Sequence, residues 1–228
     1  MLMMNVANDR DIIHNFEEFV RNAAFPCVGA KSALNKGQMH FVLADDICSA
    51  WDDLRILPHV SALAKHYREK PDLFQTLVVI FRRSDRLTER RFERAIWDRL
   101  QSLSDKDEWL GQPVDPRVST DPEDPHFAVS FAGEAFFIVG LHPNASRPAR
   151  RFDHPVMVFN LHDQFERLRA EGRYDPLRNT IMKRDEQLAG SMNPMLAQHG
   201  EGSAARQYSG RNVEDEWVCP FSRKSEAA

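Results

Sequence analysis

Apolar residues recur along the chain with two different periods, which predict helices and strands in alternation. A spacing of three and four residues is typical of an amphipathic helix, and it occurs in residues 9–24, 46–68, 88–103, 161–171 and 176–189. Pro58 indicates a break inside the second of these segments. Short runs of β-branched and aromatic residues predict strands at residues 39–45, 76–81, 127–131, 135–141 and 156–160. Gly133, between the third and fourth runs, predicts an antiparallel hairpin.

The order of these elements predicts an α/β or α+β fold in a single domain that spans residues 1–228. We expect a mixed sheet of about five strands with helices packed over it, although the pattern does not fix the order of the strands. Residues 104–125 are rich in Asp, Pro and Gly, and predict a long surface loop that could act as a lid. After residue 190, Pro and Gly recur among large apolar side chains such as Tyr208 and Trp217. We therefore expect a C-terminal segment that wraps a ligand pocket.

The composition narrows the class of protein. Apolar residues make up 42% of the chain, with 15 Phe and 4 Trp, which is enough for a core and excludes an intrinsically disordered chain. The formal net charge of −4 argues against a general nucleic-acid binder. No stretch approaches the ~20 apolar residues of a membrane span, and the first residues lack the apolar core of a signal peptide. We therefore expect a cytoplasmic protein without a membrane span.

Charge is concentrated at one turn between two predicted strands. Arg147, Arg150 and Arg151 lie within five residues of one another, close after His142. Guanidinium groups so close together repel one another unless an anion joins them, so this arginine turn, residues 142–152, predicts an anion site. The alternative is that the arginines pair with acidic residues of the same chain or are solvated.

The familiar catalytic motifs are missing from the sequence. It holds no Gly-rich phosphate loop, no GxSxG, no HExxH and no CxxC. The spacing of its central histidines, His142, His154 and His162, matches no common metal site, and His162 is expected at the start of a helix. Most common enzyme classes are thereby excluded.

The three cysteines are too widely spaced to predict a disulfide framework. Cys27 follows Pro26 in a predicted loop and is free to serve as a thiolate. Cys48 falls inside a predicted helix and is expected to be a small core residue. Cys219 lies in the C-terminal segment.

Seven short blocks, in order along most of the chain, resemble the YqcI/YcgG family. They are FPCVGA (25–30), FAGEAFF (131–137), HPNASRPARRF (142–152), VFNLHDQFERLR (158–169), GSMNPML (190–196), ARQYSG (205–210) and WVCPF (217–221). Members of that family with an understood role are haem-dependent N-oxygenases, such as the guanitoxin-pathway N-hydroxylase and the azomycin-pathway 2-aminoimidazole N-oxygenase. The resemblance implies haem b as the cofactor, with its iron.

The resemblance also assigns roles to particular residues. Thiolate ligation favours oxygen activation, so Cys27 is the expected iron ligand, with His142 and Cys219 left open as alternatives. If it is not the ligand, His142 is expected to bond a propionate or to act in proton delivery as a catalytic residue. The haem propionates would be held by arginines of the turn, with a second clamp nearer the C-terminus. These expected cofactor-binding residues are Arg147, Arg150, Arg151, Arg206 and Tyr208.

The function implied is that of a haem-dependent N-oxygenase, a monooxygenase that hydroxylates an amine, arylamine, amidine or guanidine nitrogen. Its partners would be this small nitrogen-containing substrate and either dioxygen with an electron donor or peroxide, and a homodimer is left open. Glu134 and Asp153 flank the turn and could hold a cationic amine, although solvated surface acids are the simpler expectation. Two other classes stay open: a non-catalytic haem or small-anion binding or sensor protein, and an interaction module without a cofactor, in which the arginines pair with acidic residues.

Overall fold

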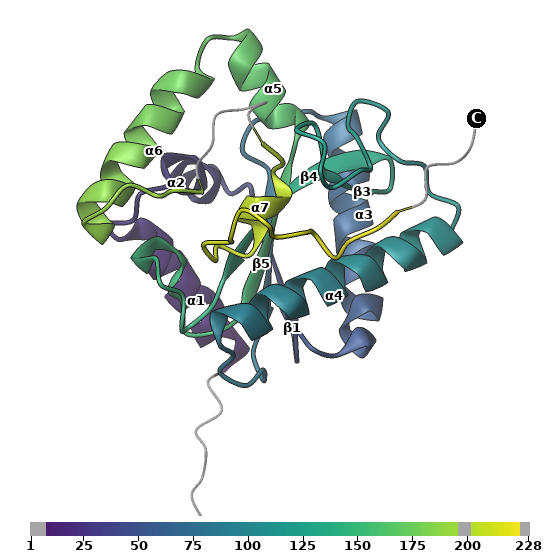
Figure 1. Ribbon diagram of the computed structural model, residues 1–228, viewed down its shortest axis with the longest axis horizontal. Helices are drawn as coiled ribbons and strands as arrows, with labels where there is room; N and C mark the ends of the chain where they lie inside the picture. The colour runs from purple at the N-terminus through teal and green to yellow at the C-terminus, as the bar shows by residue number, and fades with distance from the viewer. Residues whose placement is uncertain (1–7, 196–201, 224–228) are drawn as a thin grey trace, which may run out of the picture.

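A five-stranded mixed sheet forms the centre of the computed structural model, which describes residues 8–195 and 202–223 (Figure 1). The strand order is β1-β2-β5-β4-β3. β1 runs parallel to β2, and all other neighbouring strands are antiparallel. The strands are β1 (Met39–Ala44), β2 (Thr76–Phe81), β3 (Val129–Phe131), β4 (Glu134–Leu141) and β5 (Val156–Leu161). The expected α/β class, the five strands and the hairpin are confirmed.

Local sequence explains the two best-defined connections. β2, TLVVIF, is buried along its whole length and lies in register with β1 after the crossover through a helix. Between β3 and β4 only Ala132 and Gly133 turn the chain, with φ of 50° and 80°. A two-residue hairpin loop needs positive φ at both positions. The Ala132 N–H donates to the carboxylate of Asp107 at 3.0 Å, which helps to hold this uncommon conformation for alanine.

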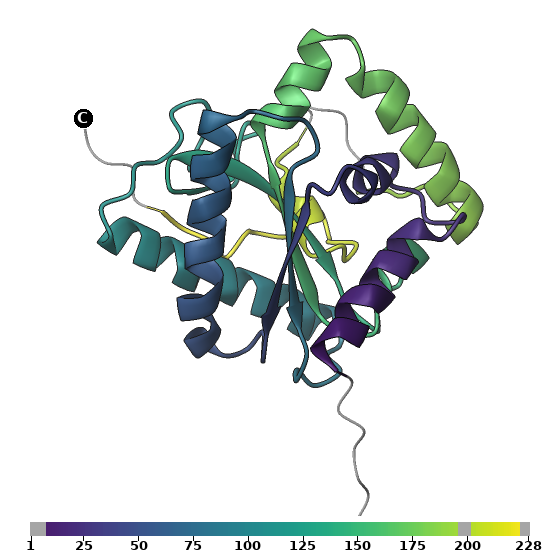
Figure 2. The same cartoon turned by 180° about the vertical axis from the view of Figure 1, so that it is seen from behind.

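Helices cover the two faces of the sheet unequally. α3 and α4 lie on one face, and α1 and α2 on the other (Figures 1 and 2). α6 packs against α2 and α5, and the short α7 packs beside β4. The helices are α1 (Asp9–Arg21), α2 (Val28–Asn35), α3 (Asp53–Glu69), α4 (Glu89–Trp109), α5 (Asp163–Ala170), α6 (Tyr174–Ala189) and α7 (Ala205–Tyr208), with 3₁₀ turns η1 (Ala50–Asp52) and η2 (Pro148–Arg150).

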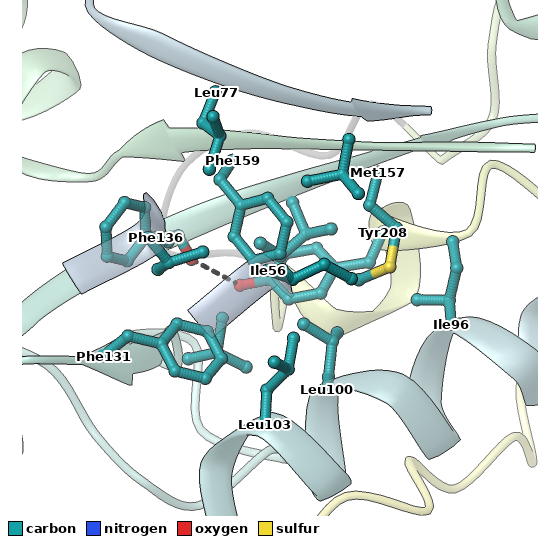
Figure 3. Packing of buried hydrophobic residues seen from close by; sticks show 14 of the residues in the cluster. Ile56, Leu77, Ile96, Leu100, Leu103, Phe131, Phe136, Met157, Phe159 and Tyr208 are labelled. Atoms are coloured by element: carbon teal, nitrogen blue, oxygen red, sulfur yellow. Dashed lines mark hydrogen bonds between the residues drawn. The ribbon is translucent and has the colours of Figure 1, made fainter. Parts of the chain in front are cut away.

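The main core lies between the sheet and the pair α3 and α4. Figure 3 shows Phe131, Phe136 and Phe159 of the sheet facing Leu100 and Leu103 of α4. All five side chains are fully buried. Burying one large apolar side chain contributes about 1.5–3 kcal/mol, so this face is the main source of stability.

The second face has a smaller cluster and is covered less completely. Ile12, Phe16 and Val20 of α1 pack there as a buried stripe, as the helical period predicts. Val139 and Val158, in the neighbouring strands β4 and β5, belong to the same cluster but keep partial exposure. Apolar surface near the middle of the sheet is therefore left incompletely covered.

Several expectations for the helices were wrong. α3 runs through Pro58 without a break; Leu54, four residues earlier, is 69% exposed, so water can bind the carbonyl that the proline leaves without a donor. Cys48 is exposed in the turn before η1, not in the core. α4 continues to Trp109, so the long loop begins later than expected, and its role as a lid stays a prediction.

The C-terminal segment packs onto the body of the molecule, as expected. Tyr208, Cys219 and Phe221 are buried in the main core. Whether the segment wraps a ligand pocket stays a prediction, and residues 196–201 within it lie outside the described residues. Among the residues described, none of the helices combines the length and hydropathy needed to cross a membrane.

Candidate functional site

Cys27 stands at the start of α2, where its side chain caps the helix. The thiol Sγ accepts a hydrogen bond from the Ala30 N–H at 3.4 Å. This helix was not expected, because Gly29, Ser32 and the preceding Pro26 weaken its helical signal. The cysteine that was expected on a free loop is instead fixed in place by the first turn of α2.

Charge and hydrogen bonding around Cys27 oppose the effect of its burial. Burial raises the pKa of the Cys27 thiol, while the N–H groups of Ala30 and Gly29 and the positive charges of Arg150 and Lys31 lower it. The effect of burial is the larger one, so the pKa of the thiol is raised overall, and the neighbouring N–H groups and cations offset part of that rise.

Cys219 has the opposite surroundings. It is 6% exposed, and burial raises its pKa to about 12, with the negative charges of Glu123 and Glu93 adding to the shift. Cys48 is exposed, and its pKa is raised by partial burial and then by Asp46. Of the three cysteines, only Cys27 combines cationic neighbours with N–H donors at a helix start.

Arg150 occupies the centre of the arginine turn. Its guanidinium donates to the carbonyls of Gly140 at 2.9 Å, Gln207 at 3.2 Å and Tyr208 at 3.4 Å. It thereby joins the edge of β4 to the end of α7, whose last carbonyls favour a cation. Burial lowers the Arg150 pKa to about 10, opposed by Asp185 and Cys27. In the described part of the chain, no carboxylate pairs with this partly buried cation.

The other arginines of the turn are engaged within the chain. Arg147 forms a short ion pair with Asp185 of α6 and donates to the hydroxyl and carbonyl of Ser191 at 3.1 and 3.0 Å. Both partners of this ion pair are largely buried, which fixes α6 to the turn. Arg151 donates to the carbonyls of Ala145 and Ser146 at 3.0 and 3.1 Å.

His142 lies on the α4 side of the turn. Its ring is 1% exposed and stacks on Phe92 of α4 with ring centres 4.2 Å apart. Burial lowers its pKa to about 4, and Nδ1 has no hydrogen-bond partner among the described residues. The backbone N–H of His142 donates to the Arg150 carbonyl at 3.0 Å, so the residue closes the turn through its main chain.

The expected second clamp lies beside Arg150 but is directed elsewhere. Arg206 donates to the carbonyls of Glu214, Asp215 and Trp217 at 2.8–3.1 Å. The Tyr208 hydroxyl donates to the Phe136 carbonyl at 3.1 Å in the main core, and burial raises its pKa. α7 therefore touches the turn through its backbone carbonyls, which Arg150 binds.

The sequence did not predict which acidic residues pair with the arginines. Asp185 is 38 positions from Arg147, and no spacing rule connects them. Glu134, expected at the surface, is 6% exposed and binds Arg117 at 2.7 Å, so that expectation was wrong. Asp153 is exposed, as expected, and His162 stands at the start of α5, as expected.

A separate surface pocket of about 320 Å³ is lined by charged residues, but it lies apart from the cysteine. Arg117 forms its wall and donates to Asp115, Glu134 and Asp163 at 2.7–2.9 Å. The lining residues are Arg117, His126, His162, Asp163 and Glu166. Within the described ranges, no group of three or more His, Cys, Asp or Glu side chains is arranged to hold a metal ion.

The site therefore belongs to a mixed α/β protein in which a cationic turn lies near a helix-capping cysteine. The chain belongs to the YqcI/YcgG family, whose family model matches residues 16–222. Cys27, the arginine turn and α7 all fall inside the matched range. Comparisons with curated proteins and with solved structures gave no match.

Proposed function

We propose that this protein binds haem b on the incompletely covered face of its sheet, with Cys27 as the iron ligand, and oxygenates a nitrogen atom of a small substrate. The observation that carries the proposal is the position of the Cys27 sulfur at the start of α2, where N–H groups and the Arg150 charge favour its thiolate. Thiolate ligation is the arrangement that favours O–O bond cleavage at haem iron.

The apolar surroundings of Cys27 fit a large flat ring. Its neighbours Phe25 and Ala30 pack in the same cluster as Val139 and Val158, which keep partial exposure near the middle of the sheet. By contrast, every residue of β2 is buried. Strands near the middle of a sheet normally bury both faces, so partly exposed valines in the cluster that Phe25 and Ala30 join are consistent with a ligand surface.

For the propionates, the structure supports Arg150 more than its neighbours. Its charge has no carboxylate partner among the described residues, so a propionate would neutralise it. Arg147 would have to give up Asp185. Arg150, Arg151 and Arg206 all donate to backbone carbonyls, but among the three only the charge of Arg150 acts on the Cys27 sulfur. Arg150 is therefore the main residue of the proposed propionate clamp.

Cys27 is a better iron ligand in this geometry than His142. The His142 ring is almost fully covered and lies against Phe92 in the α4 side of the molecule, whereas Cys27 keeps partial exposure beside the second cluster. A neutral imidazole at pH 7 also suits a supporting role more than that of a proton donor. In this proposal His142 holds the turn that positions Arg150.

When bound, haem supplies the oxygen-activating chemistry, and the protein binds and orients the substrate and excludes water. With dioxygen, one oxygen atom goes to the substrate nitrogen and the other leaves as water, which consumes a pair of electrons and two protons from a donor. With peroxide, one oxygen goes to nitrogen and the other leaves as water without added electrons. The choice of an amine, arylamine, amidine or guanidine nitrogen as the target rests on the family resemblance.

A second candidate function is non-catalytic binding of haem or of a small anion. The partly buried charge of Arg150, which has no carboxylate partner in the described residues, favours this function, because any carboxylate ligand would neutralise that charge. Turnover separates the two functions, since a binding or sensor protein would load the cofactor without oxidising arylamines or guanidines.

A haemin titration of the purified protein tests the proposal. We expect a saturable Soret band for the wild type, for the matched control Cys219→Ser and for His142→Gln, and loss or strong weakening for Cys27→Ser. The reconstituted protein with a reductant or peroxide should convert an arylamine or guanidine to its N-hydroxy product. Absence of any Soret band in the wild type would contradict haem binding, and a Soret band without product would leave only the binding function.

A further inference from the structure

The solvent face of α4 carries a stripe of polar side chains with a charge gradient. Six residues repeat at a spacing of three and four, the spacing of the contact positions in a coiled coil. Five of them are exposed and the glutamine is half-buried. The α4 stripe consists of Arg91, Arg94, Asp98, Gln101, Asp105 and Glu108.

The stripe begins with two arginines, Arg91 and Arg94, and its charged residues after them are all acidic: Asp98, Asp105 and Glu108. This order opposes the helix dipole, which favours acidic side chains near the start of a helix and basic ones near its end. Arg91, Arg94 and Glu108 have no side-chain hydrogen bond or ion pair within the described residues that would offset this cost. Helix stability alone therefore does not explain the arrangement.

A second copy of the same helix, running antiparallel, complements the stripe residue by residue. Around a two-fold axis near the middle of α4, Arg91 faces Glu108 of the partner subunit, Arg94 faces its Asp105, and Asp98 faces its Gln101. In all three pairs the residue numbers add up to the same value, so a single register satisfies them together. A two-fold interface requires this property, because each pair must occur twice.

Exposed apolar residues stand at the acidic end of the stripe. Trp109 is 84% exposed and Leu110 is 54% exposed, at the end of α4. Trp51 and Leu54 are 83% and 69% exposed, and they flank Asp53 in sequence. The Asp53 carboxylate accepts from Lys106 of α4 at 2.8 Å, which brings the start of α3 beside this end of the helix.

In the antiparallel register, this apolar end meets the basic end of the partner. An arginine guanidinium stacks favourably on a tryptophan ring, so Trp109 suits the exposed arginines near the start of the other α4. Along one flank of the stripe, Arg90 binds Glu214 at 2.6 Å and Gln101 binds the Ser222 carbonyl at 2.8 Å. Figure 1 shows α4 along the outside of the molecule, with the C-terminal segment beside it.

We infer that the α4 stripe is a self-complementary interface through which two copies of this chain form an antiparallel, two-fold symmetric dimer. Because the contacts at its centre are polar, the dimer should be weak and should weaken further with salt. This inference is independent of haem binding.

Sedimentation velocity of the full-length chain tests the interface, at about 10–200 µM protein and at about 25 and 500 mM salt. In the first variant, Arg91→Glu and Arg94→Glu make the whole stripe acidic. In the second variant, Asp105→Arg and Glu108→Arg leave Asp98 as the one acidic residue among four arginines of the stripe. We expect each variant alone to dimerise at least about tenfold more weakly than the wild type, and a 1:1 mixture to form a heterodimer.

Two further variants control for folding defects and for changes in net charge. A variant with all four substitutions keeps the wild-type net charge and should dimerise like the wild type. The control Arg10→Glu with Glu69→Arg, at exposed positions off the stripe, should leave dimerisation unchanged. A wild type that stays monomeric at low salt and the highest concentration would overturn the inference, as would dimers that are insensitive to the reversals.

Discussion

The two faces of the sheet are built from similar residues but are closed to different degrees. Toward α3 and α4, Phe136, Phe159 and Trp97 are at most 2% exposed. Toward α1 and α2, Val139 and Val158 stay partly exposed, and Cys27, at the start of α2, has cationic and N–H neighbours. The difference indicates a functional division between the two faces. The first face supplies most of the stability, and the second leaves apolar surface available to a ligand.

Truncation of aromatic side chains should show this division most strongly. Phe159→Ala empties a fully buried site in the main core and should lower the free energy of unfolding by about 3–5 kcal/mol. Phe41→Ala, at a partly exposed position of β1 in the smaller cluster, should cost roughly 1–2 kcal/mol. Urea unfolding at pH 7 measures both, and equal losses would contradict the unequal closure of the faces.

The free energy of unfolding should depend on pH because of His142, which is buried against Phe92 of α4. Its pKa is about 4 when folded and 6.5 otherwise, so the unfolded chain binds more protons between these values. The free energy of unfolding should therefore be highest above pH 6.5 and fall by up to about 3 kcal/mol as the pH drops to about 4. In urea titrations across this range, His142→Gln should have a shallower slope than the wild type, while a change at the exposed His14 should not.

The ion pair between Arg147 and Asp185 should matter mainly for α6. Arg147→Met leaves a largely buried carboxylate without its partner and should cost about 2 kcal/mol, less than for a completely buried pair because some exposure remains. The double variant Arg147→Met with Asp185→Leu should recover part of this loss. Hydrogen exchange should increase in α6 and stay unchanged in β2; a uniform increase would show that the pair supports the whole fold instead.

Repeating patterns explain how much of this fold the sequence could predict. The continuous run of β2 and the stripe of α1 identify their elements directly, because periodicity and burial are local consequences of the side chains. α2 was missed because Gly29 weakens its helical signal, and the cap that starts it is a cysteine, an uncommon capping residue. Pro58 led to a wrong prediction because the free-energy cost of a proline inside a helix depends on whether water reaches the carbonyl four residues earlier. That access is decided by the tertiary structure, which the local sequence does not show.

The candidate site was predictable only in part, for the same reason. Cys27 and the arginine turn could be selected from the sequence, and the structure brings Arg150 close enough to offset part of the rise in the Cys27 pKa that burial causes. The carbonyl partners of Arg150 and the Asp185 partner of Arg147 depend on long-range packing, which spacing along the chain does not encode. The division between the two faces appeared only in the folded structure.

The ferrous carbonyl spectrum of the haem-reconstituted protein tests the central claim most directly. If Cys27 on the open face ligates the iron, the wild type and Cys219→Ser should show the red-shifted band typical of thiolate-ligated haem, and Cys27→Ser should lose it. His142→Gln should keep that band. A histidine-type spectrum in the wild type, abolished by His142→Gln and unchanged by Cys27→Ser, would contradict the account.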